Sequence, residues 1–122
     1  MRKCEVICVY VIPAPEDISQ FEGKPFYSLQ AYYEMLGKSA KPWFETITEV
    51  AKLMGLGDDK IITDIIADVS STADAIINYA STTNVNLIVM GTKGRTGLKR
   101  FLIGSVADAV VRHAHCPVLV VR

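Results

Sequence analysis

Four short segments of the chain are nearly continuous runs of apolar residues. They are residues 4–12 (CEVICVYVI), 60–67 (KIITDIIA), 86–90 (NLIVM) and 117–122 (PVLVVR). Runs of this length that are rich in β-branched residues are typical of strands buried on both faces of a sheet. We therefore expect four buried strands.

The segments between these runs have apolar residues at helical spacing. Residues 28–54 predict a helical stretch with a break at Pro42, because an interior proline cannot donate a helical hydrogen bond. A second helix is expected to open at Ser71, with Asp74 three residues later as in a capping box. A third is expected from Ser105 to His113.

Strands and helices thus alternate along the chain, with one glycine-rich loop before the last helix. This order predicts an α/β fold, in which an open, mostly parallel sheet carries helices on both faces. The chain has 122 residues, 50% of them hydrophobic, which is enough for one domain over residues 1–122 with a real core.

Charge and composition exclude several classes of partner. Thirteen basic residues balance 13 acidic ones, so no overall field attracts nucleic acid or an anionic membrane. No apolar run approaches the ~20 residues needed to span a bilayer, and Glu5 interrupts the first run too early for a signal peptide. Three cysteines in no metal-site pattern suit a reducing compartment. We expect a cytoplasmic protein with no nucleic-acid or membrane partner.

The glycine-rich loop lies in GTKGRTGLKRFLIGSVADAV, residues 91–110. Gly91 ends an expected strand, and ligands of open α/β sheets bind beyond the carboxyl ends of strands. Glycines allow close approach of the backbone and positive φ, and the helix beginning at Ser105 presents free N–H groups. The loop also carries four basic residues: Lys93, Arg95, Lys99 and Arg100. These features favour a phosphate-bearing ligand, although Ser105 with Asp108 is equally a capping box and both roles can coexist.

The spacing Gly91, two residues, Gly94, nine residues, Gly104, Ser105 resembles the nucleotide-binding signature of the universal stress protein family. Residues 86–122 resemble the C-terminal half of that family almost throughout, whereas residues 4–83 resemble it only in the order of elements. The resemblance implies a five-stranded parallel sheet in the order 3-2-1-4-5.

The resemblance also implies a ligand, namely ATP, with AMP or ADP as alternatives and Mg²⁺ as a companion of the phosphates. Gly91 and Gly94 would approach the ribose and phosphates, Gly104 and Ser105 would bind phosphate oxygens, and Val11 would line the adenine pocket. The full set of implied binding residues is Val11, Gly91, Thr92, Lys93, Gly94, Arg95, Gly104, Ser105 and Val106. The last strand, Val118 to Val121, resembles one that pairs two subunits of a homodimer.

The chain departs from the family at its start, because it has no counterpart of the family's first strand and helix. We therefore expect an N-terminally truncated sheet of about four strands per chain. Buried strands without neighbours would leave unpaired backbone groups that cost roughly 1–3 kcal/mol each. Residues 4–12 could pair directly with 86–90, a second subunit could complete the sheet, or the natural product could have a longer N-terminus. A rearranged or dimer-completed sheet is favoured.

The resulting expectation is a regulatory, stress-related ATP-binding protein without strong catalytic machinery, capable at most of slow ATP hydrolysis. The alternative is a dimerising scaffold of the same fold that binds no nucleotide because its first strand is missing.

Three other patterns are discounted. The GKS of residues 37–39 lacks the glycine and the preceding strand of a P-loop. His113, His115 and Cys116 would not share one side of an extended segment, so a metal site is not expected. Four aromatic residues are expected to pack in the core or between helix and sheet rather than to form a partner surface: Tyr32, Tyr33, Trp43 and Phe44.

Overall fold

The computed structural model describes residues 5–15, 18–24, 26–67, 71–92 and 103–122. The chain divides into two compact units, Met1–Ala67 and Asp68–Arg122. Each unit has its own pair of strands and its own helices. The expectation of one domain over residues 1–122 stays a prediction.

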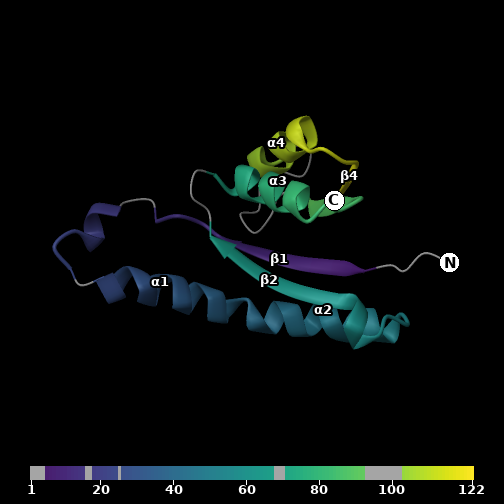
Figure 1. Cartoon of the computed structure of the whole chain (residues 1–122), viewed down its shortest axis with the longest axis horizontal. Coiled ribbons are helices and arrows are strands. Elements are labelled where there is room, and N and C mark those ends of the chain that lie inside the picture. Colours follow the sequence, from purple (N-terminus) through teal and green to yellow (C-terminus); the bar gives the residue numbers. More distant parts are fainter. Residues whose placement is uncertain (1–4, 16–17, 25, 68–70, 93–102) are drawn as a thin grey trace. The chain divides into compact units, whose positions relative to one another are not determined.

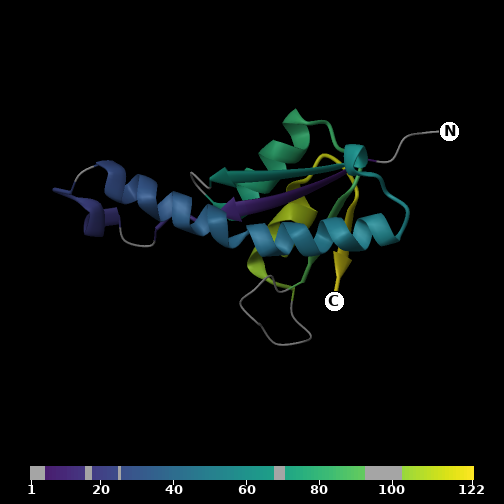
Figure 2. The same cartoon turned by 90° about the horizontal axis from the view of Figure 1, so that it is seen from below.

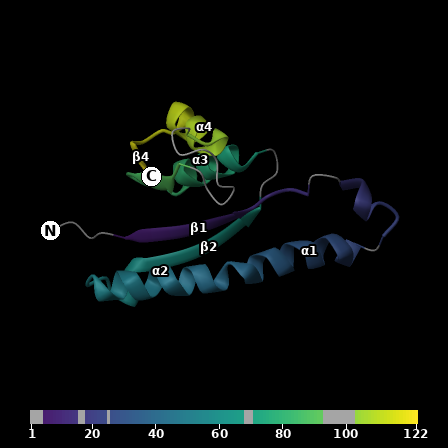
Figure 3. The same cartoon turned by 180° about the vertical axis from the view of Figure 1, so that it is seen from behind.

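The first unit is built on two parallel strands, β1 (Val6–Ile12) and β2 (Ile61–Ala67). Their register runs from Val6 opposite Ile61 to Ile12 opposite Ala67. Between the strands lie η1 (Ile18–Phe21), α1 (Phe26–Ser39), α2 (Lys41–Leu53) and η2 (Asp58–Lys60). Both α-helices run along the same face of the strand pair (Figures 1 and 3). The strands begin within two residues of their predicted starts.

The predicted break in the long helical stretch is confirmed. Pro42 stands in the first turn of α2, where an amide has no helical acceptor to lose. The link between the helices is Ala40, which is fully buried. Its N–H donates to the Gly37 carbonyl at 3.2 Å, and its carbonyl accepts from Phe44 at 3.0 Å.

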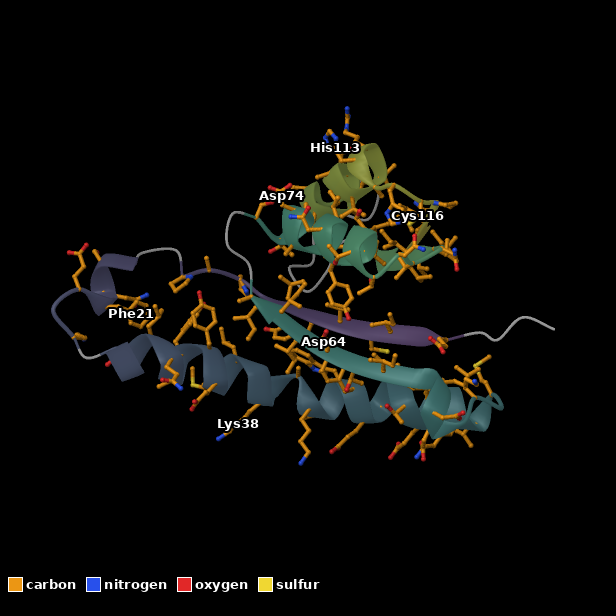
Figure 4. All side chains as sticks on the ribbon, in the orientation of Figure 1. Phe21, Lys38, Asp64, Asp74, His113 and Cys116 are labelled. Atoms are coloured by element: carbon orange, nitrogen blue, oxygen red, sulfur yellow. The ribbon has the colours of Figure 1, made fainter. Side chains whose placement is uncertain are left out.

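Aromatic and aliphatic side chains hold α1 and α2 on the strands. The rings of Tyr10 on β1 and Trp43 on α2 meet edge to face, with centroids 5.3 Å apart. The Tyr32 hydroxyl donates to the Pro13 carbonyl at 3.1 Å, which ties α1 to the segment after β1. Packing is thus confirmed as the role of Tyr32 and Trp43. Figure 4 shows Lys38, from the discounted GKS, on α1 and pointing away from the strand pair.

The second unit packs two helices against a second parallel pair of strands. Its elements are α3 (Thr72–Thr82), β3 (Ile88–Gly91), α4 (Ser105–His113) and β4 (Val118–Val121). The register runs from Ile88 opposite Val118 to Gly91 opposite Val121. Four residues form its buried core: Ala73, Ala80, Ile88 and Val110. Ala73 and Ala80 are the buried residues of α3.

The start of α3 is capped as predicted. Ser71 has extended backbone (φ −154°, ψ 155°), and its hydroxyl accepts a hydrogen bond from the Asp74 N–H at 3.0 Å. Asp74 also places a negative charge in the first turn, where the helix dipole favours it (Figure 4).

The α/β class with parallel strands is confirmed, and the strands of the described residues form two parallel pairs, β1–β2 and β3–β4. The direct pairing of residues 4–12 with 86–90 was one of three possibilities for completing the sheet, and it stays untested. No helix within the described ranges has both the length and the apolar character of a membrane span.

Candidate functional site

The predicted ligand loop leaves the second unit at the end of β3 and returns at the start of α4. Gly91 is the last residue of β3, and Gly104 is the residue that precedes α4. Figure 2 shows that β3 and β4 end on the side of this unit where α4 begins. The carboxyl ends of two parallel strands and a helix N-terminus therefore meet, as expected for an anion site in an α/β fold.

Backbone hydrogen bonds fix this meeting point. The Thr92 N–H donates to the Val121 carbonyl at 3.0 Å, which extends the β3–β4 pair by one residue. The Gly104 N–H donates to the Thr92 carbonyl at 2.6 Å. Thr92 thus links the end of β4 to the start of α4.

In the first turn of α4, three backbone amides have no acceptor within the part of the chain that the structure describes. The first amide to bond within the helix is that of Asp108, which donates to the Gly104 carbonyl at 2.9 Å. For the N–H groups of Ser105, Val106 and Ala107, no acceptor is found among the described residues. These are donors that an α-helix leaves open at its N-terminus, where its dipole also favours negative charge.

The interpretation of Ser105 as a helix cap is wrong. Gly104 occupies the cap position with extended backbone (φ −64°, ψ 158°), and Ser105 is the first helical residue. A capping side chain must come from the extended residue before the helix, so Ser105 cannot fold back in this way. Its side chain is exposed, and the Asp108 carboxylate pairs instead with Arg112 at 3.0 Å.

Positive φ is not the reason for glycine at Gly91 and Gly104, contrary to the expectation. The described glycines with positive φ are Gly23 and Gly55. A Cβ on Gly91 would meet the Val121 carbonyl oxygen at 3.8 Å, which is an ordinary contact. The absence of a side chain therefore leaves room beside the backbone here, rather than permitting a special conformation.

The remaining predicted site residues fall into three groups. The side chain of Val106 packs against the core of the second unit, so only its backbone is available to a ligand. Val11 lies near the end of β1 in the first unit, half-buried and opposite Ile66. Lys93, Gly94 and Arg95 lie outside the described residues.

Two contributors were missed at the level of sequence. The Val121 carbonyl accepts from the Thr92 N–H, and the Ala107 amide is a third first-turn donor without an acceptor among the described residues. The Val121 carbonyl could have been found from a parallel pairing of the last strand with residues 86–90. The Ala107 amide could have been found by counting the amides that a helix start leaves open.

The histidines and cysteine near the C-terminus have other surroundings. The His115 Nε2 atom lies 3.1 Å from the Val85 carbonyl oxygen, which connects the segments that precede β3 and β4. His113 is in the last turn of α4, whereas Cys116 packs against the core (Figure 4). Within the described ranges, no three His, Cys, Asp or Glu side chains gather as metal ligands.

Comparison with known sequences gives a consistent family. A model of the universal stress protein family matches residues 1–122. Universal stress protein MJ0531 of Methanocaldococcus jannaschii is 39% identical over 119 residues, which are 97% of this chain and 65% of that protein. The chain thus spans a little less than two thirds of that relative. A putative universal stress protein of Staphylococcus haemolyticus is 56% identical over 43 residues, 35% of this chain and 26% of that protein.

Solved structures agree with this result. Hypothetical protein MJ0577 matches with a TM-score of 0.67 and 28% identity, over 99% of this chain and 78% of that one. Universal stress protein UspA from Lactobacillus plantarum matches with a TM-score of 0.68 over 95% of this chain and 76% of that one, at 22% identity, a likeness that shows the fold alone. The family match over the whole chain and the 39% identical relative establish that this chain belongs to the universal stress protein family.

Proposed function

We propose that this chain binds ATP, or the related nucleotides ADP and AMP, at the junction of β3 and α4, and that occupancy of this site regulates its contacts with partners. The proposal places the phosphates at the start of α4 and keeps Val11 as an expected contact of the adenine. In this function the chain is a cytoplasmic homodimer that pairs through Val118–Val121.

The single observation that carries the proposal is the contrast between the starts of α3 and α4. Both are helix N-termini, and each is followed by an aspartate in the first turn. At α3, the Ser71 hydroxyl satisfies an open amide. At α4, no side chain among the described residues does so, and three consecutive amides have no described acceptor beside two strand ends. Phosphate oxygens are suitable acceptors for such a cluster.

The donor set suits phosphates but offers no direct ligand for Mg²⁺. Asp108 is the acidic residue in the first turn of α4, and its carboxylate is paired with Arg112. A magnesium ion would therefore be held by the phosphates and water, as is common for this cation. Without a base or activated nucleophile among the described site residues, positioning alone supports at most slow hydrolysis.

The test is a charge change at the first residue of α4. Ser105→Glu adds an exposed carboxylate that the helix dipole tolerates, but that carboxylate competes with phosphate for the same amides. We expect titration calorimetry to give an ATP dissociation constant at least about tenfold higher for Ser105→Glu than for the unmodified chain. Thr72→Glu, at the first residue of α3, is the matched control with the same change in net charge and should leave the dissociation constant unchanged.

The rival function is a dimerising scaffold that binds no nucleotide. One observation favours it: four apolar residues flank or form the strand pair of the second unit and are exposed, namely Leu87, Val89, Leu119 and Val121. If millimolar ATP gives the unmodified chain neither a heat of binding nor a higher melting temperature, the nucleotide proposal fails. The scaffold function is then the one that stands. Equal loss of binding in both glutamate variants would instead indicate an effect of charge that is not local to α4.

A further inference from the structure

We infer that Thr92 is a positioning residue, and that the Gly104 amide serves the protein rather than the ligand. The two hydrogen bonds Gly104 N–H to Thr92 C=O and Thr92 N–H to Val121 C=O are called the Thr92 clasp. In this inference, the clasp fixes the first turn of α4 against the end of β4, while the amides of Ser105, Val106 and Ala107 contact the ligand. The inference rests on the proposed nucleotide site and revises which of its residues donate.

The count of donors at the helix start leads to this assignment. An α-helix leaves its first four N–H groups without helical acceptors. At α4 the first of them, that of Gly104, is already bonded to Thr92 at 2.6 Å, shorter than the usual 2.9–3.0 Å for N–H···O bonds. A ligand oxygen would have to displace that carbonyl to reach the Gly104 amide. The next three amides need no such exchange.

The clasp is also continuous with the helix itself. The Asp108 N–H donates to the Gly104 carbonyl, the Gly104 N–H to the Thr92 carbonyl, and the Thr92 N–H to the Val121 carbonyl. Hydrogen bonds arranged head to tail polarise one another in the same direction. The open amides therefore sit on a helix turn that is joined through two peptide groups to β4, and a displacement of β4 would move them.

Substitutions at Gly104 can test the Thr92 clasp, because the backbone conformation of Gly104 is one that other residues can adopt. Its dihedral angles (φ −64°, ψ 158°) are open to alanine and coincide with the φ that proline imposes. Gly104→Ala keeps the N–H of the clasp, whereas Gly104→Pro removes it. Both variants add a Cβ, so they differ mainly in the donor and in the proline ring.

The primary experiment is amide hydrogen exchange by NMR on the unmodified chain, with and without ATP. Without ATP, we expect slow exchange at Gly104 and Thr92 and fast exchange at Ser105 and Val106. With saturating ATP, Ser105 and Val106 should slow by about tenfold or more, while Gly104 should change little.

The variants give an independent readout. Without ATP, Gly104→Pro should speed exchange at Thr92 and Asp108, the neighbouring donors of the clasp and the helix, whereas Gly104→Ala should not. Gly104→Pro should also weaken ATP binding by about tenfold, as expected for one lost hydrogen bond that positions the donors, and Gly104→Ala should stay within about threefold.

The inference is overturned if the Gly104 amide exchanges as fast as Ser105 without ATP and slows only when ATP is added, because that amide would then be a ligand donor. It is also overturned if Gly104→Pro leaves exchange at Thr92 and Asp108 unchanged. The exchange rates of the unmodified chain without ATP need no ligand and do not depend on whether the proline variant folds. A chain that keeps slow exchange at Gly104 but binds no ATP would therefore contradict the proposed function and not the clasp.

Discussion

At the residue scale, the backbone of a serine decides what its hydroxyl can do. Ser71 is extended and stands before its helix, so its hydroxyl turns back onto the Asp74 amide at 3.0 Å. Ser105 is already the first helical residue, and its exposed side chain does not cap α4. The same side chain therefore stabilises α3 and is left available at α4.

A second residue-scale effect concerns the thiol of Cys8. Cys8 lies two and four residues before Tyr10 and Ile12 on β1, so the three side chains share one face of the strand. This is the face that packs against α1 and α2. Partial burial raises the pKa of the Cys8 thiol above its ordinary value, because burial disfavours the thiolate.

This shift predicts a pH dependence of stability. A group whose pKa is raised in the folded state stabilises that state at low pH, and the contribution is lost as the pH rises through the folded pKa. Between about pH 7.5 and about pH 9.5, which spans the ordinary cysteine pKa of about 8.5, the free energy of unfolding should fall more for the unmodified chain than for Cys8→Ala. Denaturant titrations at the two pH values measure the difference, and Cys116→Ala serves as the control. Parallel declines in the unmodified chain and Cys8→Ala would contradict the role of Cys8.

At the element scale, α2 shows how local sequence ends a helix. The Gly55 N–H donates to the Lys52 carbonyl at 3.0 Å, and the Leu56 N–H donates to the Ala51 carbonyl at 2.9 Å. This pattern requires a left-handed residue, and Gly55 has φ +95°. The end of the helical stretch predicted over residues 28–54 is thus confirmed within one residue, together with its physical cause.

Two glycines of these helices should respond to alanine in opposite directions. Gly37 lies inside α1, where an added Cβ would meet the Cδ1 atoms of Ile65 and Ile12 at 3.8 and 3.9 Å, both ordinary contacts. Gly37→Ala should therefore raise the free energy of unfolding by about 0.5–1 kcal/mol, through helix propensity and a less flexible unfolded chain. Gly55→Ala should lower it by about 1–2 kcal/mol, because alanine is strained at positive φ. Chemical denaturation checks both variants, and a destabilised Gly37→Ala would show that α1 lies closer to the strands than the structure indicates.

At the scale of the whole molecule, the residues proposed to contact ATP are divided between the two compact units. The proposed phosphate donors at the start of α4 belong to residues 68–122, whereas Val11, the proposed adenine contact, belongs to residues 1–67. Strands β1 and β3 each have one hydrogen-bonded partner in the two pairs.

Hydrogen exchange read by mass spectrometry tests the two proposed sets of contacts. If ATP contacts both sets as proposed, it should slow exchange in peptides that cover the first turn of α4 and also in peptides that cover the end of β1 around Val11. Peptides of α2 should be unaffected and provide the internal control. Protection confined to α4 would contradict the adenine contact of Val11 while leaving the phosphate site in place.

Much of the fold and part of the site could be predicted because the relevant forces are local. The apolar runs, the Pro42 break, the Ser71 cap and the Gly55 stop each depend on neighbours within a few residues. The same holds for the position of the glycine loop between a strand and a helix. The role of Ser105 could not be predicted, because Ser-x-x-Asp occurs at both helix starts and only the backbone of the preceding residue separates them.

The sequence by itself determined the alternation of strands and helices, the placement of the glycine loop and the family to which the chain belongs. Only the tertiary structure decided that the strands form two parallel pairs, and that the Gly104 amide is bonded to Thr92 while Thr92 is bonded to Val121. The physical reason is distance along the chain: Thr92 lies 12 residues from Gly104 and 29 from Val121, and such hydrogen-bond partners are chosen by folding rather than by local pattern.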